Sequence, residues 1–203
     1  LFRNLLLRKE QLPALLRLML VMQDMVNSGG DSFIGDTALP TIGIQRLKDK
    51  NMHRDENTRA QFLRCMEETV NQLKNHPCIL YWTIFNEGWG QFDSDNVYQK
   101  LRELDDTRII DSTSGWFRRR SSDVESLHIY FGPWNQIRPG KKPVILSEFG
   151  GYTYPVEDHI FNPDHAYGYK TCKTIEEFQT GLLSLYEQTL LPAIREKGLC
   201  CAI

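Results

Sequence analysis

The chain has 203 residues, a formal net charge of −2, 41% hydrophobic residues and 25% charged residues. These values are typical of a globular protein with one good core, and they give no electrostatic reason to expect nucleic acid or anionic lipid as a partner. The most apolar early segment, Leu12–Val26, carries Arg17 and Asp24 and is shorter than the ~20 residues of a membrane span, so we predict no membrane segment.

The cysteines and histidines show no spacing that is typical of a metal site. The five cysteines lack a Cys-x-x-Cys pair and are odd in number, so we predict buried free thiols, no zinc site, no cofactor and no disulfide framework. Free thiols slightly favour a reducing compartment such as the cytoplasm, although the location stays open. Because the chain begins at Leu1 rather than Met and ends within an apolar run at Ile203, we expect a fragment of a longer protein.

The first half of the chain alternates between predicted helices and strands. Residues 1–17 predict a helix that restarts at Pro13, and Leu18–Val26 predicts a strand. Residues 27–54 carry glycines and few periodic apolar residues, which indicates a long loop. Asp55 then opens a helix whose apolar face includes Phe62, Leu63, Met66, Val70 and Leu73.

The second half predicts short strands, followed by one long helix. Ser94 is predicted to cap a short helix, and Thr174 with Glu177 forms a capping box that opens a helix to about Arg195. Gly198 ends that helix. Further strands are predicted at 78–86, 108–111, 127–130, 143–147 and, incompletely, 199–203. Strands that alternate with helices predict a parallel sheet, either open or closed into a barrel.

Two of the predicted strands end in a glutamate that is followed by glycines. The run at 78–86 stops at Asn86-Glu87-Gly88, and Pro143-Val-Ile-Leu-Ser stops at Glu148-Phe-Gly-Gly. A carboxylate at the end of a buried strand is costly unless it has a partner or a task. Either glutamate alone is explained by a strand-end ion pair, but two together match the pair of carboxylates that hydrolyses a glycosidic bond.

Other side chains at predicted strand ends suit the binding of a sugar. His128 and Tyr130 alternate on one strand and so share a face, where they form either a core pair or a substrate contact. Asp24 and Asn86 end their strands and act either as turn residues or as partners of sugar hydroxyls. Three tryptophans lie on loops after strands, where stacking on a sugar is possible: Trp89, Trp116 and Trp134.

Several motifs along the chain resemble one enzyme family. Trp82-x-x-x-Asn86-Glu87-Gly-Trp-Gly, His128-x-Tyr130 and Ser147-Glu-Phe-Gly-Gly, with Val21–Gly29 and Leu191–Leu199 at either end, are similar to the catalytic domain of glycoside hydrolase family 2. That family includes β-galactosidases, β-glucuronidases and β-mannosidases. The resemblance implies an α/β fold: a single partial domain over residues 1–203, poorly matched at 1–17, that forms an incomplete, irregular (β/α)8 TIM barrel. It would hold about strands three to seven and the start of strand eight.

The resemblance also implies a role for each matching residue. Glu87 matches the general acid/base, and Glu148 matches the nucleophile of a retaining β-glycosidase, with carboxyl groups about 5–5.5 Å apart. Asn86 matches a residue that bonds the sugar 2-hydroxyl, Tyr130 one that supports the nucleophile, and His128 a sugar contact. A carbohydrate is therefore the expected partner, while the sugar, its linkage and the oligomeric state stay open.

Two alternatives remain at this point. A barrel without its first two strands has open edges, so the chain could be a non-catalytic remnant that only binds sugar or does nothing. It could also be another two-glutamate barrel hydrolase such as an endo-glucanase, which shares the Asn-Glu, His-x-Tyr and Glu pattern.

Overall fold

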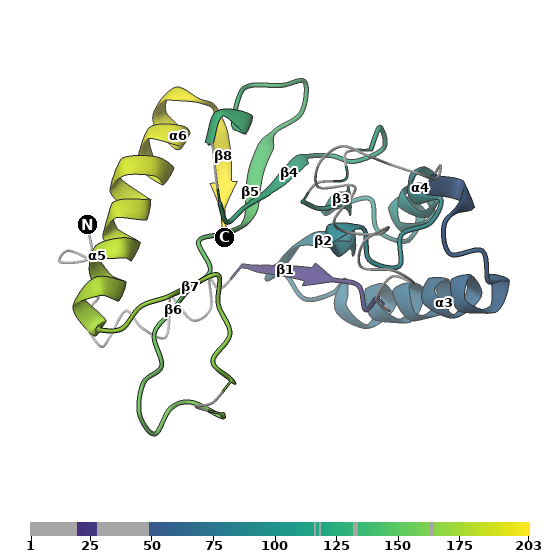
Figure 1. The fold of residues 1–203 in the computed structure, drawn as a ribbon. Helices are drawn as coiled ribbons and strands as arrows, with labels where there is room; N and C mark the ends of the chain where they lie inside the picture. The colour runs from purple at the N-terminus through teal and green to yellow at the C-terminus, as the bar shows by residue number, and fades with distance from the viewer. Residues whose placement is uncertain (1–19, 28–48, 116, 118, 132–133, 163–164) are drawn as a thin grey trace. The chain divides into compact units, whose positions relative to one another are not determined.

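The computed structural model (Figure 1) describes residues 20–27, 49–115, 117, 119–131, 134–162 and 165–203. The helix predicted over residues 1–17 and most of the loop predicted over 27–54 lie outside these ranges. The described residues form two compact units. The first unit reaches Thr113 and includes Arg119–Ser122, and the second contains the described residues of Ser114–Arg118 and of Asp123–Ile203.

The first unit contains a parallel three-stranded sheet. Its strands are β1 (Val21–Asp24), β2 (Ile79–Phe85) and β3 (Ile109–Thr113), in the order β1-β2-β3. Helix α3 (Glu56–Leu73) precedes β2, and helix α4 (Ser94–Leu104) connects β2 to β3. The alternation of strands and helices predicted for this part of the chain is therefore confirmed.

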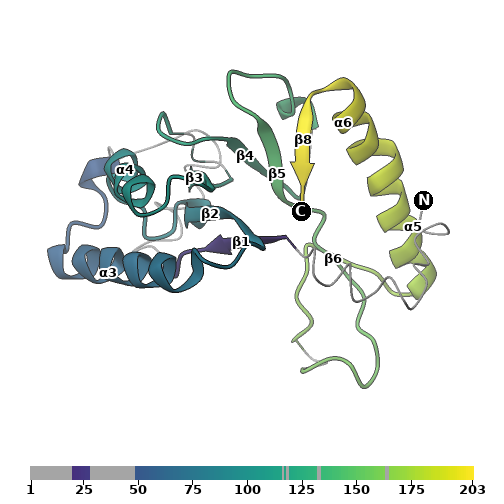
Figure 2. The same cartoon turned by 180° about the vertical axis from the view of Figure 1, so that it is seen from behind.

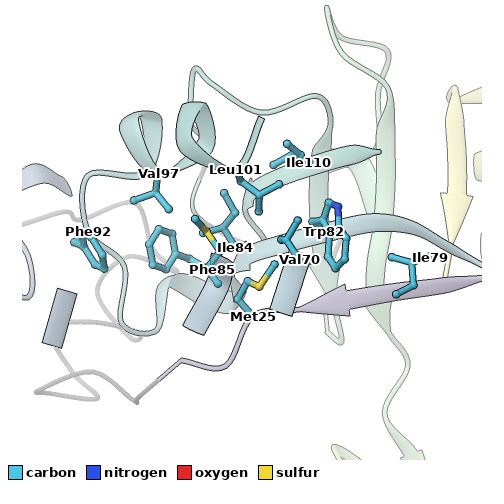
Figure 3. Close-up of a cluster of buried hydrophobic side chains, with 11 residues drawn as sticks. Met25, Val70, Ile79, Trp82, Ile84, Phe85, Phe92, Val97, Leu101 and Ile110 are labelled. Atoms are coloured by element: carbon cyan, nitrogen blue, oxygen red, sulfur yellow. The ribbon is translucent and has the colours of Figure 1, made fainter. Parts of the chain in front are cut away.

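The core of the first unit surrounds strand β2, whose side chains are buried on both faces apart from Leu80 (Figure 3). Trp82 is fully buried, and its indole nitrogen donates a hydrogen bond of 2.9 Å to Asp105 Oδ2. The Phe62 ring of α3 stacks on Phe85 with 5.1 Å between ring centroids. Burying one large apolar side chain stabilises a fold by about 1.5–3 kcal/mol, so β2 is the main anchor of this unit.

The two helices of the first unit begin in different ways. Asp55 caps α3 and accepts hydrogen bonds from the backbone of Asn57 and Thr58, as predicted. The prediction that Ser94 caps α4 was wrong, because Ser94 is already helical. The Asp49 carboxylate, from the 3-10 turn η3 (Asp49–Asn51), accepts the Ser94 backbone N–H at 2.5 Å and the Ser94 hydroxyl at 2.9 Å. Asp49, which lies 45 positions from Ser94 in the sequence, thus takes the place of a local N-cap residue.

The second unit contains another parallel three-stranded sheet. Strands β4 (Glu125–Ile129), β5 (Val144–Phe149) and β8 (Leu199–Ala202) lie in the order β4-β5-β8. Its core combines apolar side chains of these strands with Ile137, Leu190 and Ala193. A short 3-10 turn, η5 (Trp134–Gln136), lies between β4 and β5.

The long helix predicted before β8 is present with one interruption. It consists of α5 (Ile175–Leu185), a π turn η7 (Tyr186–Leu190) and α6 (Leu191–Glu196), and it leads back into β8 (Figure 2). Pro192, the second residue after the π turn, has no N–H to offer the carbonyl four residues earlier, which accounts for the interruption. Thr174 caps α5 by accepting the backbone N–H of Glu177, as predicted. Gly198, at φ 72°, follows the end of α6, also as predicted.

The described strands include one pair that the sequence did not predict. β6 (Tyr152–Thr153) and β7 (Lys170–Thr171) form a short parallel ladder in the second unit. All five cysteines are free, as predicted, but only Cys172 is buried. No helix in the described part of the chain is long and apolar enough to cross a membrane.

The α/β class and the parallel strands are confirmed, but the described strands do not form a closed barrel. They form two three-stranded sheets and the β6–β7 pair. The first unit holds β1 to β3, and the second holds β4 to β8. Each described candidate residue belongs to one of these two units.

Candidate active site

In the first unit, Glu87 lies in a tight turn directly after β2. Residues Asn86–Gly88 form the 3-10 turn η4, and Glu87 has φ 50° and ψ 26°, in the left-handed region that only a few per cent of non-glycine residues occupy. Gly88 and Gly90 also have positive φ, and the Trp89 N–H donates to Asn86 O at 2.9 Å. Backbone strain of this kind is concentrated at functional sites, so it supports Glu87 as a catalytic candidate.

The end of this turn is anchored by a residue that sequence reasoning missed. Gln91 is fully buried, and its side-chain amide donates to Asp49 Oδ1 at 2.5 Å. The Arg119 guanidinium lies 3.3 Å from the same oxygen. Asp49 therefore joins the turn after β2 to the start of α4. Asp49 lies within the loop predicted over residues 27–54, and no local sequence pattern marks it as an anchor.

The other candidates of the first unit differ in exposure. Asn86 and Glu87 are half-buried, whereas Asp24, at the carboxyl end of β1, is exposed. Asp24 pairs in register with Thr83, so its strand ends at the same edge of the sheet as β2. Trp89 is 43% exposed, which leaves its ring open to a ligand. Trp116 lies outside the described residues.

In the second unit, Glu148 has two polar neighbours: His128 on the adjacent strand β4, and Tyr130 directly after the end of β4. The Tyr130 hydroxyl donates a hydrogen bond to Glu148 Oε2, and His128 Nε2 lies 3.5 Å from Glu148 Oε1. One neighbour therefore lies beside each carboxylate oxygen. This arrangement fixes the orientation of the carboxylate, which is what an attacking group requires.

A β-bulge brings His128 and Glu148 opposite each other. The register pairs Leu127 with Leu146 and then His128 with Glu148, so Ser147 is an extra residue on β5. With a regular ladder, Ser147 would lie opposite His128, and Glu148 would lie opposite Ile129, which is buried. Bulges are common beside active sites because they re-aim a side chain in this way.

His128 is enclosed, and Glu148 is accessible. The His128 side chain is buried, whereas 37% of the Glu148 side chain is exposed. Gly115 approaches the imidazole closely: a Cβ atom at this position would lie 3.1 Å from His128 Nδ1, and the backbone here has φ +77°. Gly115 was not predicted as part of the site, and only its contact with His128 identifies it.

Trp134, on η5, packs edge-on against Phe149 with 6.4 Å between ring centroids and borders the core of the second unit.

Glu87 belongs to the first unit, and Glu148 to the second. The predicted separation of their carboxyl groups therefore stays a prediction, as do the sugar-binding roles of Asn86, Tyr130, His128, Asp24, Trp89 and Trp134.

The comparisons with known proteins point to one family. Residues 20–197 match the model described as glycosyl hydrolases family 2, TIM barrel domain. A β-galactosidase from Priestia megaterium (strain DSM 319 / IMG 1521) is 36% identical over 83 residues, which cover 37% of this chain and 8% of that protein. A β-glucuronidase from Chlorocebus aethiops is 26% identical over 156 residues, which cover 63% of this chain and 23% of that protein.

A β-glucuronidase from Pongo abelii is 27% identical over 119 residues, which cover 45% of this chain and 18% of that protein. Among solved structures, the β-D-glucuronidase of Dictyoglomus thermophilum aligns with a TM-score of 0.48 and 19% identity, covering 75% of this chain and 29% of that one. The chain thus spans less than a quarter of the length of these curated relatives. Because the family model covers most of its residues, the chain belongs to glycosyl hydrolase family 2 and carries TIM-barrel-domain sequence of that family.

Proposed function

We propose that this chain carries the catalytic glutamates of a retaining β-glycosidase that removes a terminal β-linked sugar. Membership of the family supports hydrolysis of a carbohydrate. The assignment to specific residues rests mainly on the contacts of Glu148. The Tyr130 hydroxyl donates a hydrogen bond to its carboxylate, and the His128 imidazole lies beside the other carboxylate oxygen.

Glu148 is the proposed nucleophile. Its carboxylate attacks the anomeric carbon while the bond from that carbon to the leaving oxygen breaks, and a covalent glycosyl-enzyme forms. The hydrogen bond from Tyr130 limits the rotation of the Glu148 carboxylate. Fixing the attacking oxygen in this way lowers the entropic part of the barrier.

Glu87 is the proposed general acid and base. In the first step its carboxylic acid gives a proton to the leaving oxygen, and in the second step its carboxylate takes a proton from the water that releases the sugar. The two steps return Glu87 and Glu148 to their starting protonation states. The strained left-handed backbone at Glu87 supports this role, because such strain at non-glycine residues is concentrated at active sites.

The sugar is proposed to be a pyranoside of the kind that the relatives' names describe, a β-galactoside or a β-glucuronide. Asn86 and Asp24 are proposed to bind sugar hydroxyls, and Trp89 and Trp134 are proposed to stack on the sugar ring.

The decisive experiment uses the protein that carries this chain, with 4-nitrophenyl β-galactoside and β-glucuronide as substrates. Glu148→Ala should lose turnover, and azide should restore it with inversion of the anomeric configuration of the product. Glu87→Ala should react only with substrates that have a good leaving group, and azide should then give a product of retained configuration. Glu196→Ala, on the exposed end of α6, is the matched control and should keep full activity.

Full activity in both Glu87→Ala and Glu148→Ala would contradict the proposal. Turnover of polysaccharides but not of the aryl monosaccharides would favour the endo-glucanase alternative. A folded protein with no turnover of either kind would favour the non-catalytic remnant.

A further inference from the structure

Three aromatic side chains of the second unit form a cluster beside Tyr130: Phe131, Tyr167 and Tyr169. Tyr169 is the centre of this aromatic cluster. Its ring lies on that of Tyr130, with 4.0 Å between centroids and 32° between planes. The Tyr169 ring packs edge-on against Phe131, with 5.5 Å between ring centroids and 90° between ring planes. It also contacts Tyr167, with 5.8 Å between centroids and 66° between planes.

The aromatic cluster presents most of its surface to solvent. Phe131 is 67% exposed, Tyr167 is 80% exposed and Tyr169 is 39% exposed. Single exposed apolar residues are normal, but contiguous aromatic surface is typical of binding sites. The core of this unit lies elsewhere, around Leu127, Leu146 and Leu190. The exposed rings of Phe131 and Tyr167 therefore lie outside this core.

The backbone holds Tyr169 in place. The Tyr169 N–H donates to Gly151 O at 2.8 Å. Gly151 has φ +65°, and a Cβ atom there would lie only 2.4 Å from Tyr169 Cδ2, so any other residue would displace the ring. Gly168 is similarly restricted, since its Cβ would lie 2.7 Å from the Thr153 side chain. The two glycines thus fix the ring that organises the cluster.

The position of the cluster indicates its ligand. One face of Tyr130 touches Tyr169, and the hydroxyl of Tyr130 donates to Glu148, so the cluster lies one ring away from the proposed nucleophile. The face of an aromatic ring carries partial negative charge, which attracts the weakly positive C–H groups on the apolar face of a pyranose. We propose that the aromatic cluster is a platform on which a pyranose ring of the carbohydrate substrate stacks, an inference that rests on the proposed role of Glu148.

The test measures KM and kcat separately in the protein that carries this chain, with the aryl glycoside that it hydrolyses. Phe131→Ala and Tyr167→Ala should each raise KM about fivefold to tenfold, a tenfold change corresponding to about 1.4 kcal/mol, while kcat stays within about twofold. Tyr167→Phe keeps the ring and should keep the wild-type KM. Tyr169→Phe should do the same, whereas Tyr169→Ala removes the centre of the cluster and should raise KM most.

Phe161→Ala is the matched control, because Phe161 is a fully exposed aromatic residue between β6 and β7 that makes no described ring contact with the cluster. An unchanged KM in Phe131→Ala and Tyr167→Ala, or an equal rise in Phe161→Ala, would overturn the platform. If Glu148→Ala loses turnover while the cluster variants keep the wild-type KM, the platform alone is overturned. If Glu148→Ala keeps full activity, the proposed function is overturned.

If the protein hydrolyses neither aryl glycoside, calorimetry with galactose and with glucuronate decides the matter. Binding to the wild type that weakens about fivefold or more in Tyr167→Ala but not in Tyr167→Phe supports the platform. Equal binding by all three proteins, or no binding of either sugar to the wild type, overturns it.

Discussion

The imidazole of His128 and the carboxylate of Glu148 lie opposite each other on adjacent parallel strands, with 3.5 Å between His128 Nε2 and Glu148 Oε1. Tyr130, two residues after His128, donates its hydroxyl proton to the other carboxylate oxygen. His128 on β4, Tyr130 just after β4 and the accessible Glu148 on β5 thus form one polar group.

Tyr130→Phe should reduce kcat/KM for an aryl glycoside by about tenfold to a hundredfold, because a hydrogen bond to a charged group contributes about 1.5–3 kcal/mol. The variant keeps the ring and its stacking on Tyr169, so its Tm should stay close to that of the wild type. Tyr186→Phe, which removes an exposed hydroxyl at the π turn, is the control. Equal activity of Tyr130→Phe and wild type would show that the hydroxyl does not assist Glu148.

Glu87→Gly should stabilise the protein by about 1 kcal/mol, because glycine occupies the left-handed region without the steric cost that a side chain incurs. It should also lose turnover of substrates with a poor leaving group, because the proposed general acid is gone. Glu87→Ala keeps a Cβ atom in the same backbone conformation, so it should show the same loss of activity toward substrates with a poor leaving group, without this gain in stability. Urea unfolding of both variants beside the wild type measures the difference. A less stable Glu87→Gly would mean that the glutamate side chain supports the turn rather than straining it.

Gly115→Ala should destabilise the protein by about 1–3 kcal/mol and lower its activity. The new Cβ would meet His128 Nδ1 at 3.1 Å on a backbone with φ +77°, which costs about 1–2 kcal/mol before any displacement of the imidazole. Gly140→Ala is a matched control, because its φ is not in the left-handed range and its nearest contact, at 3.5 Å, is ordinary. Thermal unfolding should separate the two variants, and similar Tm values for both would contradict the close approach.

Asp105 should make stability depend on pH in the acid range. Burial raises the pKa of Asp105, but hydrogen bonds from Thr107 and Trp82 and the charge of Arg108 together outweigh burial and hold that pKa below its usual value. A lowered folded-state pKa stabilises the fold fully above the unfolded pKa of about 4, and this contribution is lost as the pH falls through the folded-state value.

The free energy of unfolding should therefore fall more steeply below about pH 4 in the wild type than in Asp105→Asn. Asp106→Asn, an exposed neighbour, should follow the wild-type curve. Parallel curves for wild type and Asp105→Asn would show that the lowered pKa does not contribute to stability.

Much of the fold could be predicted because its signals are local. The apolar run before Glu87 identified β2 to within one residue at each end, and Asp55 and Thr174 were recognised as caps from their own neighbourhoods. Both glutamates were identified from the abrupt change from apolar residues to Glu and Gly. Such patterns depend on residues within one or two turns of each other.

The features that were missed depend on distant partners. Asp49 caps α4 across 45 positions, and Gly115 is important only because His128 lies against it. Strands β6 and β7 are two residues each, too short to show the alternation that reveals a strand. The bulge at Ser147 appears only when β4 and β5 are paired, because the sequence of β5 alone gives no sign of an extra residue.

The short β6–β7 ladder has a consequence for the segment that it encloses. The β6–β7 ladder consists of two residue pairs, and it joins the two ends of a segment of 16 residues between Thr153 and Lys170. The backbone N–H groups of Tyr169 and Lys170 both donate to Gly151 O. None of the described residues of this segment is buried, which means a small free energy of local opening. Amide protons of this segment should therefore exchange with deuterated water far faster than those of β5, and slower exchange on addition of a sugar would report its arrival there.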